Sequence, residues 1–256
     1  MARKNIINLT GVVGSGVTHS LRNSKDFFFF KLFLARRKHV GTDEPIIEVL
    51  DENLFPEVSR LSVGDAVHIE GEIRTRSATK TLTCDRCSTL YSTSIMITSI
   101  AVGEDGFQIL PLIKGHTFSE NHAYLLGTLV KDPQVWTTRN NIPKTKYQMA
   151  INRKDSTGGA DYPFISSYKR LAQEDAHRLQ HGSQLFVEGA VQTSVRPRSI
   201  VCPGCGNIHT LRSLNTEIVA RSTEYLNRCR FPENADPNHW ALNELSKIKN
   251  LAQELG

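Results

Sequence analysis

Two Cys-x-x-Cys pairs are the residues in this 256-residue chain whose types and spacing most directly suggest chemistry. Cys84 and Cys87 form the first pair, and Cys202 and Cys205 form the second, within Cys-Pro-Gly-Cys-Gly. Each pair supplies two thiolates, half of a tetrahedral metal site, and glycine and proline allow the tight turn that such a site needs. The four cysteines therefore predict one structural zinc ion (Zn2+), bound within one chain or between two chains.

A redox-active dithiol is the alternative interpretation of these pairs. It requires a helix N-terminus and a thioredoxin-like unit, and the sequence indicates neither, so a structural metal is preferred. His209 stays outside the predicted ligand set, because Tyr91 stands at its equivalent place beside the other pair. The sequence shows no signal peptide and no membrane-spanning run, so we expect a cytoplasmic protein whose cysteines are reduced.

The two cysteine pairs lie at equivalent places in an internal repeat. Residues 59–77 align with residues 177–195 at a constant offset of 118, and the cysteines keep that offset. Gly11 and Gly127 correspond at an offset of 116. The chain is therefore a duplicated unit followed by an extension. The predicted boundaries are 1–103 for the first domain, 104–120 for a linker, 121–226 for the second domain, and 227–256 for a linker and C-terminal helix.

Each unit is predicted to be mainly β, with five strands and one helix between the third and fourth strands. This order is typical of the OB-fold, a small Greek-key barrel, although another small barrel or sandwich has a similar strand count. The predicted strands of the first unit are 6–13, 27–35, 45–50, 66–73 and 95–102, with a helix at 53–61. Those of the second unit are 123–130, 145–153, 162–169, 184–191 and 212–220, with a helix at 171–179.

The second unit resembles a known family. Residues 121–133, Asn-His-Ala-Tyr-Leu-Leu-Gly-Thr-Leu-Val-Lys-Asp-Pro, are similar to the opening strand of bacterial single-stranded DNA-binding proteins. Residues 147–153 resemble their second strand, and residues 182–189 resemble their fourth. The resemblance extends to the first unit through the repeat. It implies two tandem OB-folds that bind single-stranded DNA without strong sequence preference during replication, repair, recombination or transfer.

The resemblance places the stacking aromatic residues of the second unit at Tyr162 and Tyr168. Their even spacing predicts that both lie on one face of the third strand, although either ring can instead be half-buried with its hydroxyl bonded. Trp136 either reaches the DNA groove from a loop or plugs the core. Nearby cations are predicted to contact phosphates; they are Lys144, Lys146, Arg153, Lys154, Lys169 and Arg170.

The second predicted strand of the first unit is rich in phenylalanine. Phe27, Phe29 and Phe33 are expected to face away from the core residues of that strand, with Lys31 among them. They form either a second stacking surface or a domain interface, and the interface is preferred because exposed phenylalanines are costly in water. The predicted core residues of this strand are Phe30, Leu32 and Leu34.

Two further residues of the first unit are predicted to contact DNA. Arg74 and Arg76 echo the end of the family's fourth strand. At the two positions that hold Tyr162 and Tyr168 in the second unit, the first unit has Glu44 and Leu50. The surrounding segment of the first unit also carries four other carboxylates, Asp43, Glu48, Asp51 and Glu52. A carboxylate cannot stack on a base and repels phosphate, so the second unit is predicted to bind DNA more strongly.

The overall charge and the lack of catalytic motifs favour a binding protein. The formal net charge is +5 and the sequence pI is about 9.0, which suits a polyanionic partner. Phosphate-binding loops, nucleophile motifs and paired catalytic carboxylates are not evident, so no enzyme is predicted. A scaffold subunit of a replication or primosome complex and an RNA-binding OB protein stay open as alternatives. The predicted C-terminal helix either packs on its own barrels, recruits replication or recombination proteins, or supports a homo-oligomer.

Overall fold

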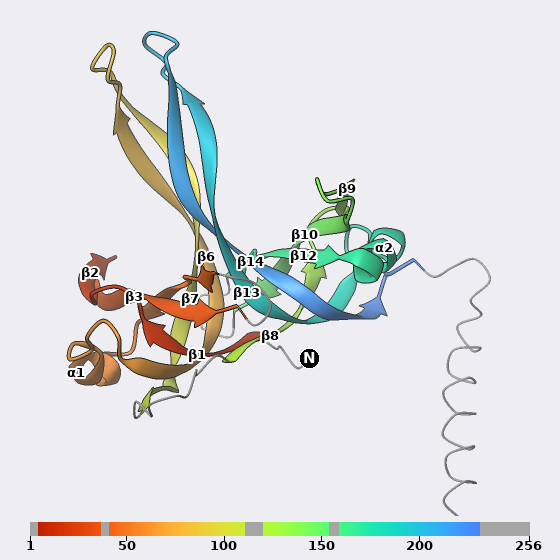
Figure 1. Cartoon of the computed structure of the whole chain (residues 1–256), viewed down its shortest axis with the longest axis horizontal. Coiled ribbons are helices and arrows are strands. Elements are labelled where there is room, and N and C mark those ends of the chain that lie inside the picture. Colours follow the sequence, from red (N-terminus) through yellow and green to blue (C-terminus); the bar gives the residue numbers. More distant parts are fainter. Residues whose placement is uncertain (1–4, 37–40, 111–119, 154–158, 231–256) are drawn as a thin grey trace, which may run out of the picture.

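The computed structural model describes residues 5–36, 41–110, 120–153 and 159–230 as an all-β protein. A continuous 14-stranded sheet curls into two barrels (Figure 1). The first barrel contains β1 (Asn5–Val13), β2 (Thr18–Arg22), β3 (Lys25–Ala35), β4 (Thr42–Asp43), β5 (Ile46–Val49), η1 (Glu52–Leu54), α1 (Phe55–Val58), β6 (Ala66–Thr83) and β7 (Leu90–Leu110). The second contains β8 (Glu120–Leu129), β9 (Gln134–Thr137), β10 (Pro143–Asn152), β11 (Ala160–Asp161), β12 (Phe164–Tyr168), α2 (Lys169–Arg178), β13 (Gln184–Val201) and β14 (Ile208–Asn227).

Both barrels close in the order of an OB-fold. In the first, β1 pairs with β3 and β6, β3 pairs with β5, and β5 runs parallel to β7, which returns to β6. In the second, β8, β10, β12, β14 and β13 repeat this circuit, with β12 and β14 parallel. The prediction of two tandem OB-folds is therefore confirmed.

Strict alternation along the second strand of each barrel builds the core. Phe30, Leu32 and Leu34 on β3 are buried, as the sequence predicts. Tyr147 and Met149 occupy the corresponding inward positions of β10 and are also buried. Because successive side chains of a strand point to opposite faces, the residues between them are left for the outer surface.

An approximate twofold relation joins the barrels. Strand β1 pairs antiparallel with β8, and Ile7 lies opposite Ala123. These residues are 116 apart, the offset at which the N-terminal halves of the repeat align. The equivalent strands β1 and β8 therefore pair with each other in a register that matches equivalent residues. The sheet continues from one barrel to the other without an exposed strand edge at the junction.

Two equivalent polar clusters complete the junction. Asp43 of the first barrel accepts a 2.7 Å hydrogen bond from the backbone N–H of Thr193 in the second. Asp161 of the second barrel accepts a 2.7 Å bond from the backbone N–H of Thr75 in the first. Arg36 pairs with Asp43 and also donates to the Thr193 carbonyl. The hypothesis that the β3 phenylalanines form the domain interface is thus wrong for this junction, which polar groups and the β1–β8 pairing build.

Two long hairpins project beyond the barrels (Figure 1). We call residues 77–98 of β6–β7 the first arm and residues 195–216 of β13–β14 the second arm. The arms lie side by side, and the Arg198 side chain of the second donates a 3.0 Å hydrogen bond to the Ser94 carbonyl of the first. Paired strands thus carry each cysteine pair to the tip of an arm.

The boundaries of several elements differ from the predictions. The helix of the first unit is only η1 and α1, and the third strand of the second unit begins at Phe164 because Pro163 interrupts it. Strand β7 continues to Leu110, through the start of the predicted linker, because a β-bulge between the pairs Ile69–Phe107 and Gly71–Val102 accommodates residues 103–106. The predicted C-terminal helix lies outside the described residues. Within the described part of the chain, no helix is long and apolar enough to cross a membrane.

Candidate nucleic-acid interface and metal centre

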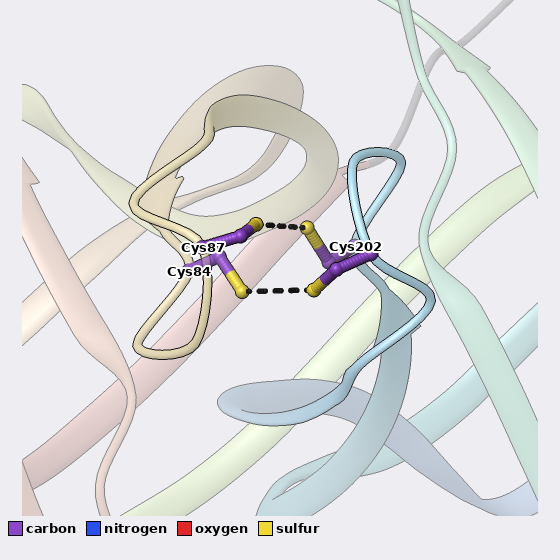
Figure 2. A group of neighbouring side chains, drawn as sticks. Cys84, Cys87 and Cys202 are labelled. Atoms are coloured by element: carbon purple, nitrogen blue, oxygen red, sulfur yellow. Dashed lines mark hydrogen bonds between the residues drawn. The ribbon is translucent and has the colours of Figure 1, made fainter.

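Four cysteine sulfurs from the two arm tips converge on one point (Figure 2). The Sγ atoms of Cys84 and Cys205 are 3.6 Å apart, as are those of Cys87 and Cys202, and all four lie within 4.8 Å of one another. These separations are too long for disulfides, which need about 2.05 Å. The four residues that the sequence predicts as ligands therefore form one cluster, within a single chain, that can hold a metal ion.

The same tight turn shapes both tips. The backbone N–H of Cys84 donates to the Thr89 carbonyl, and the N–H of Cys202 donates to the Asn207 carbonyl. Ser88 and Gly206, which are 118 apart, both have left-handed backbone, with φ of 57° and 72°. Glycine adopts this conformation freely and serine at a small cost, so the second tip is the less strained of the two.

The surroundings of two of the sulfurs shift the pKa values of Cys84 and Cys205 in opposite directions. Burial raises the pKa of Cys84, but bonds from backbone amides, including that of Cys87, and from His209 outweigh it and lower that pKa to about 5. The Asn207 amide lowers the pKa of Cys205, yet the bond with Cys87 and burial raise it to about 12. Four thiolates this close together would repel one another, and a divalent cation would relieve that repulsion.

His209 supports this cluster from the second arm. Its Nε2 lies 3.3 Å from the Cys84 sulfur, and its ring packs 5.9 Å from the ring of Tyr91. His209, which the repeat places outside the predicted ligand set, lies next to the four sulfurs and is not one of the clustered cysteines. The repeat gives no sign, however, that His209 and Tyr91, which are equivalent in it, meet across the arms beside the sulfurs.

The outer face of the second barrel carries paired cations. Lys144 and Lys146 lie on β10 and reach Glu217 on β14 at 3.4 and 3.2 Å, and Arg196 approaches the same carboxylate at 3.6 Å. Glu217 is buried, and although burial alone raises its pKa, the surrounding ammonium groups bring it below its usual value. Lys144 is only 6% exposed, so the prediction that it meets phosphate directly does not fit its place.

Aromatic rings cover these cations. The Nζ of Lys144 lies 5.6 Å from the Trp136 ring centre and 4.8 Å from that of Tyr168, and it donates to the Tyr168 hydroxyl at 2.8 Å. Lys146 lies 4.4 Å from the ring centre of Phe164. Trp136 is 41% exposed on β9, so it is not a plug in the core. The face therefore combines flat rings and positive charge, the two features that a single strand requires.

Tyr162 and Arg153 lie at the junction between the two barrels and not among these paired cations. Tyr162 follows β11 instead of lying on β12, so the two tyrosines do not share a strand. The residue is 41% exposed beside the junction, where its backbone N–H donates a 2.7 Å hydrogen bond to the Thr75 hydroxyl. Arg153 donates two 2.9 Å hydrogen bonds to the Asp161 carboxylate and one to the Thr75 carbonyl. The prediction that Arg153 binds phosphate does not fit these contacts, because its guanidinium holds the two barrels together.

Two of the remaining predicted cations of this unit follow Tyr168 directly. Lys169 and Arg170 are exposed at the start of α2, where Lys169 takes a left-handed backbone conformation. Arg170 pairs with Glu174 one turn later, a surface contact that contributes little to stability. Lys154 lies outside the described residues.

The first barrel presents phenylalanines where the second presents lysines. Phe29 and Phe33 lie on the outer side of β3, and Phe33 is 37% exposed. Phe27 is only 6% exposed, because the Arg22 guanidinium covers its ring at 4.3 Å. Lys31 stands between them and pairs with Glu44 at 3.2 Å. Two of the three rings are thus accessible.

A buried carboxylate again organises the cations of this face. Glu48 is 2% exposed and lies 2.9 Å from Arg22 and 3.2 Å from Arg76. Burial raises its pKa, but the two guanidinium groups outweigh burial and bring that pKa below its usual value. Arg74, also predicted to contact DNA, pairs with Glu72 at 3.0 Å near the junction.

Sequence reasoning missed four residues of these faces: Phe164, Arg22, Glu48 and Glu217. Phe164 stands four residues before Tyr168, so even spacing alone could have found it. Glu48 and Glu217 could not be predicted from the sequence for another reason. A carboxylate is expected to disfavour DNA binding, and only the strand pairing shows that these two carboxylates neutralise cations beside them.

Comparisons with known proteins agree with this architecture. Residues 120–199 match the model of the single-strand binding protein family. The single-stranded DNA-binding protein of Caldanaerobacter subterraneus subsp. tengcongensis is 30% identical over 110 residues, which cover 41% of this chain and 67% of that protein. Single-stranded DNA-binding protein 2 of Staphylococcus aureus strain COL is 30% identical over 110 residues, covering 41% and 73%.

Solved structures extend the likeness to both barrels. A deletion variant of the single-stranded DNA binding protein from Thermus aquaticus has a TM-score of 0.62 and 15% identity, covering 92% of this chain and 100% of that one. The wild-type protein has a TM-score of 0.60 and 14% identity, covering 93% and 99%. At such low identity the likeness concerns the fold, and it supports two tandem barrels.

Proposed function

Because the chain belongs to the single-strand binding protein family, we propose that it binds single-stranded DNA without strong sequence preference and protects it during replication, repair, recombination or transfer. The observation that carries this proposal is the outer face of the second barrel. There Trp136, Phe164 and Tyr168 lie over Lys144 and Lys146. Rings accept any base by stacking, while cations follow the backbone, so no base sequence is selected.

Binding of oligo-dT, compared with a duplex of equal length, tests this function. We expect much tighter binding to the single strand, with a log–log salt slope of about −0.7 per neutralised phosphate. An oligo-U competitor of equal length distinguishes DNA from RNA. Equal affinity for duplex and single strand would contradict the proposal, and preference for oligo-U would favour the RNA-binding alternative.

We further propose that the four-cysteine cluster holds zinc. A tetrahedral zinc site with bonds of about 2.3 Å separates its sulfurs by about 3.8 Å, close to the two distances of 3.6 Å seen here. The ion, when bound, supplies a structural cross-link between the arms. Cys84, Cys87, Cys202 and Cys205 would hold it, and His209 would orient the Cys84 sulfur through its hydrogen bond.

Metal analysis of the purified protein tests the zinc site. We expect about one zinc per chain, its loss in Cys202→Ser, and a lower unfolding temperature in that variant, because structural metal binding is coupled to folding. Cys229→Ser is the matched control, since this buried thiol lies outside the cluster. Zinc retained in Cys202→Ser, or no zinc in the wild type, would contradict the proposal.

The remaining parts of the proposal concern organisation. The domain boundaries become about 5–110 and 120–230, with the arms shared at the metal centre. The protein would act by binding and not by catalysis, in the cytoplasm, and with replication or recombination proteins as partners. Self-association into a homo-oligomer is part of the same proposal, which size measurement with and without oligo-dT tests.

A further inference from the structure

A groove runs between the two arms near their bases. Its volume is about 210 Å³. It is lined by both arms together with β5, through Ile46, Lys80, residues 95–98 and residues 211–214. Neither hairpin forms this groove alone, because its two walls come from different barrels.

The lining of the groove is apolar with positive charges. Met96 is 44% exposed, and Leu211 and Ile46 add aliphatic surface. Lys80 and Arg212 are exposed side chains that also line the groove, and its lining contains no carboxylate. An apolar slot with cations is complementary to a nucleotide, whose base has two apolar faces and whose phosphate is an anion.

The charge of the arms points to the same class of ligand. Five cations lie on residues 77–98 and 195–216, namely Lys80, Arg86, Arg196, Arg198 and Arg212. Asp85, at the first tip, is the single carboxylate in these two ranges. A protein partner would have to be acidic to match this surface, whereas any nucleic acid strand does so by its nature.

We propose that the groove between the arms is a second binding subsite, which takes a base of the bound single strand while Lys80 and Arg212 contact flanking phosphates. This inference rests on the proposed function. The subsite is continuous with the second-barrel face, since Arg196 at the base of the second arm lies 3.6 Å from Glu217 of that face. A strand that leaves the face therefore reaches the groove along a row of cations.

The subsite depends on the arms staying together. The arms meet through the four-cysteine cluster at their tips and through the bond from Arg198 to the Ser94 carbonyl. The groove lies nearer the barrels than both contacts. Separation of the arm tips would therefore widen the groove, and the bound nucleotide base would lose contact with one of its two walls. Zinc would thereby act on DNA affinity without touching DNA.

The test compares long and short oligonucleotides on a charge-reversed protein. Lys80→Glu with Arg212→Glu should weaken binding of an oligo-dT of about 35 nucleotides roughly tenfold and reduce the salt slope by about 1.4. Binding of an oligo-dT of about eight nucleotides, which one barrel can hold, should stay unchanged. Arg60→Glu with Arg228→Glu makes the same change at exposed positions of the two barrels outside the arms, and should leave both affinities closer to wild type.

A second variant isolates the base contact. Met96→Ala should weaken binding of the long oligonucleotide several-fold and leave the salt slope unchanged, because it removes no charge. Unchanged long-strand affinity in the charge-reversed protein would overturn the subsite, and unchanged affinity in Met96→Ala would overturn its role as a base pocket. Failure of the proposed function is separate, since the wild type would then bind neither oligonucleotide. Circular dichroism checks that each variant folds.

Discussion

The outer faces of the two barrels contain the same three kinds of group, but on different strands. In the first barrel, the second strand carries the rings Phe29 and Phe33, and the third carries the buried Glu48. In the second barrel, β10 carries the two lysines, β9 and β12 carry the rings, and the buried Glu217 lies on β14. Each face thus keeps one buried carboxylate, its cations and a group of aromatic rings.

This comparison changes the reason for expecting unequal barrels. The sequence suggests that acidic residues make the first unit repel DNA. Two of these, Asp43 and Glu48, are instead buried in ion pairs with arginines, so they offer little charge to a phosphate. The remaining difference lies in the rings and in one extra cation around Glu217. Inequality of the barrels therefore stays a prediction that rests on stacking.

The largest expected effect comes from removing rings on the second face. Trp136→Ala with Tyr168→Ala should reduce affinity for a short oligo-dT about a hundredfold or more, because each stacked base contributes about 1–3 kcal/mol. Phe29→Ala with Phe33→Ala should cost about tenfold. Fluorescence anisotropy titrations measure both variants. A larger loss in the phenylalanine pair, in a protein that still folds, would reverse the roles of the two barrels.

The buried carboxylates give a smaller and different contrast. Glu217→Gln should lower the free energy of unfolding by about 3 kcal/mol, because it leaves the buried Lys144 without its ion-pair partner. Glu48→Gln should cost about 1 kcal/mol, since the side chains of Arg22 and Arg76 are 33% and 35% exposed and can turn to water. Urea unfolding at pH 7 measures both values, and equal losses would contradict the contrast.

The pH dependence of these two variants follows from the direction of the shifts. Both carboxyl groups have a folded-state pKa below the usual 4.5. Their stabilising contribution is therefore complete above pH 4.5 and is lost as the pH falls through the folded-state pKa. The difference between wild type and each variant should narrow below pH 4.5. Glu70→Gln, at an exposed position, is the control and should show little difference at any pH.

The sequence was sufficient to predict the features that depend on the internal repeat and on the alternation of side chains along a strand. The offset of 118 led to the two barrels and the shared cysteine cluster, and alternation along β3 separated Phe30 and Leu32 from the outer rings. Sequence reasoning failed where long-range pairing decides a side chain's role. From the sequence, Arg153 is predicted to contact DNA, but the pairing of β10 with β11 places Asp161 beside it. Lys144 is predicted to be exposed, but Trp136 and Tyr168 cover it.

The smallest expected effect is a gain, at the first-barrel position equivalent to Tyr168. Leu50 stands there, just after β5, and is 46% exposed. Leu50→Tyr should add one ring to the outer face at little cost in folding, because the leucine is not part of the core. We expect affinity for oligo-dT to rise several-fold, about 1 kcal/mol, the low end of a stacking contact.

The gain should be clearest in a protein that already carries Trp136→Ala and Tyr168→Ala, since the first barrel then dominates binding. Val63→Tyr is the matched control, because Val63 is 63% exposed in the turn before β6 and lies on none of the strands β2, β3, β5 and β6 that carry the face. An equal gain in both variants would mean that any added ring helps. No gain from Leu50→Tyr would mean that DNA does not cross this end of the first barrel, and that the barrels differ in path as well as in strength.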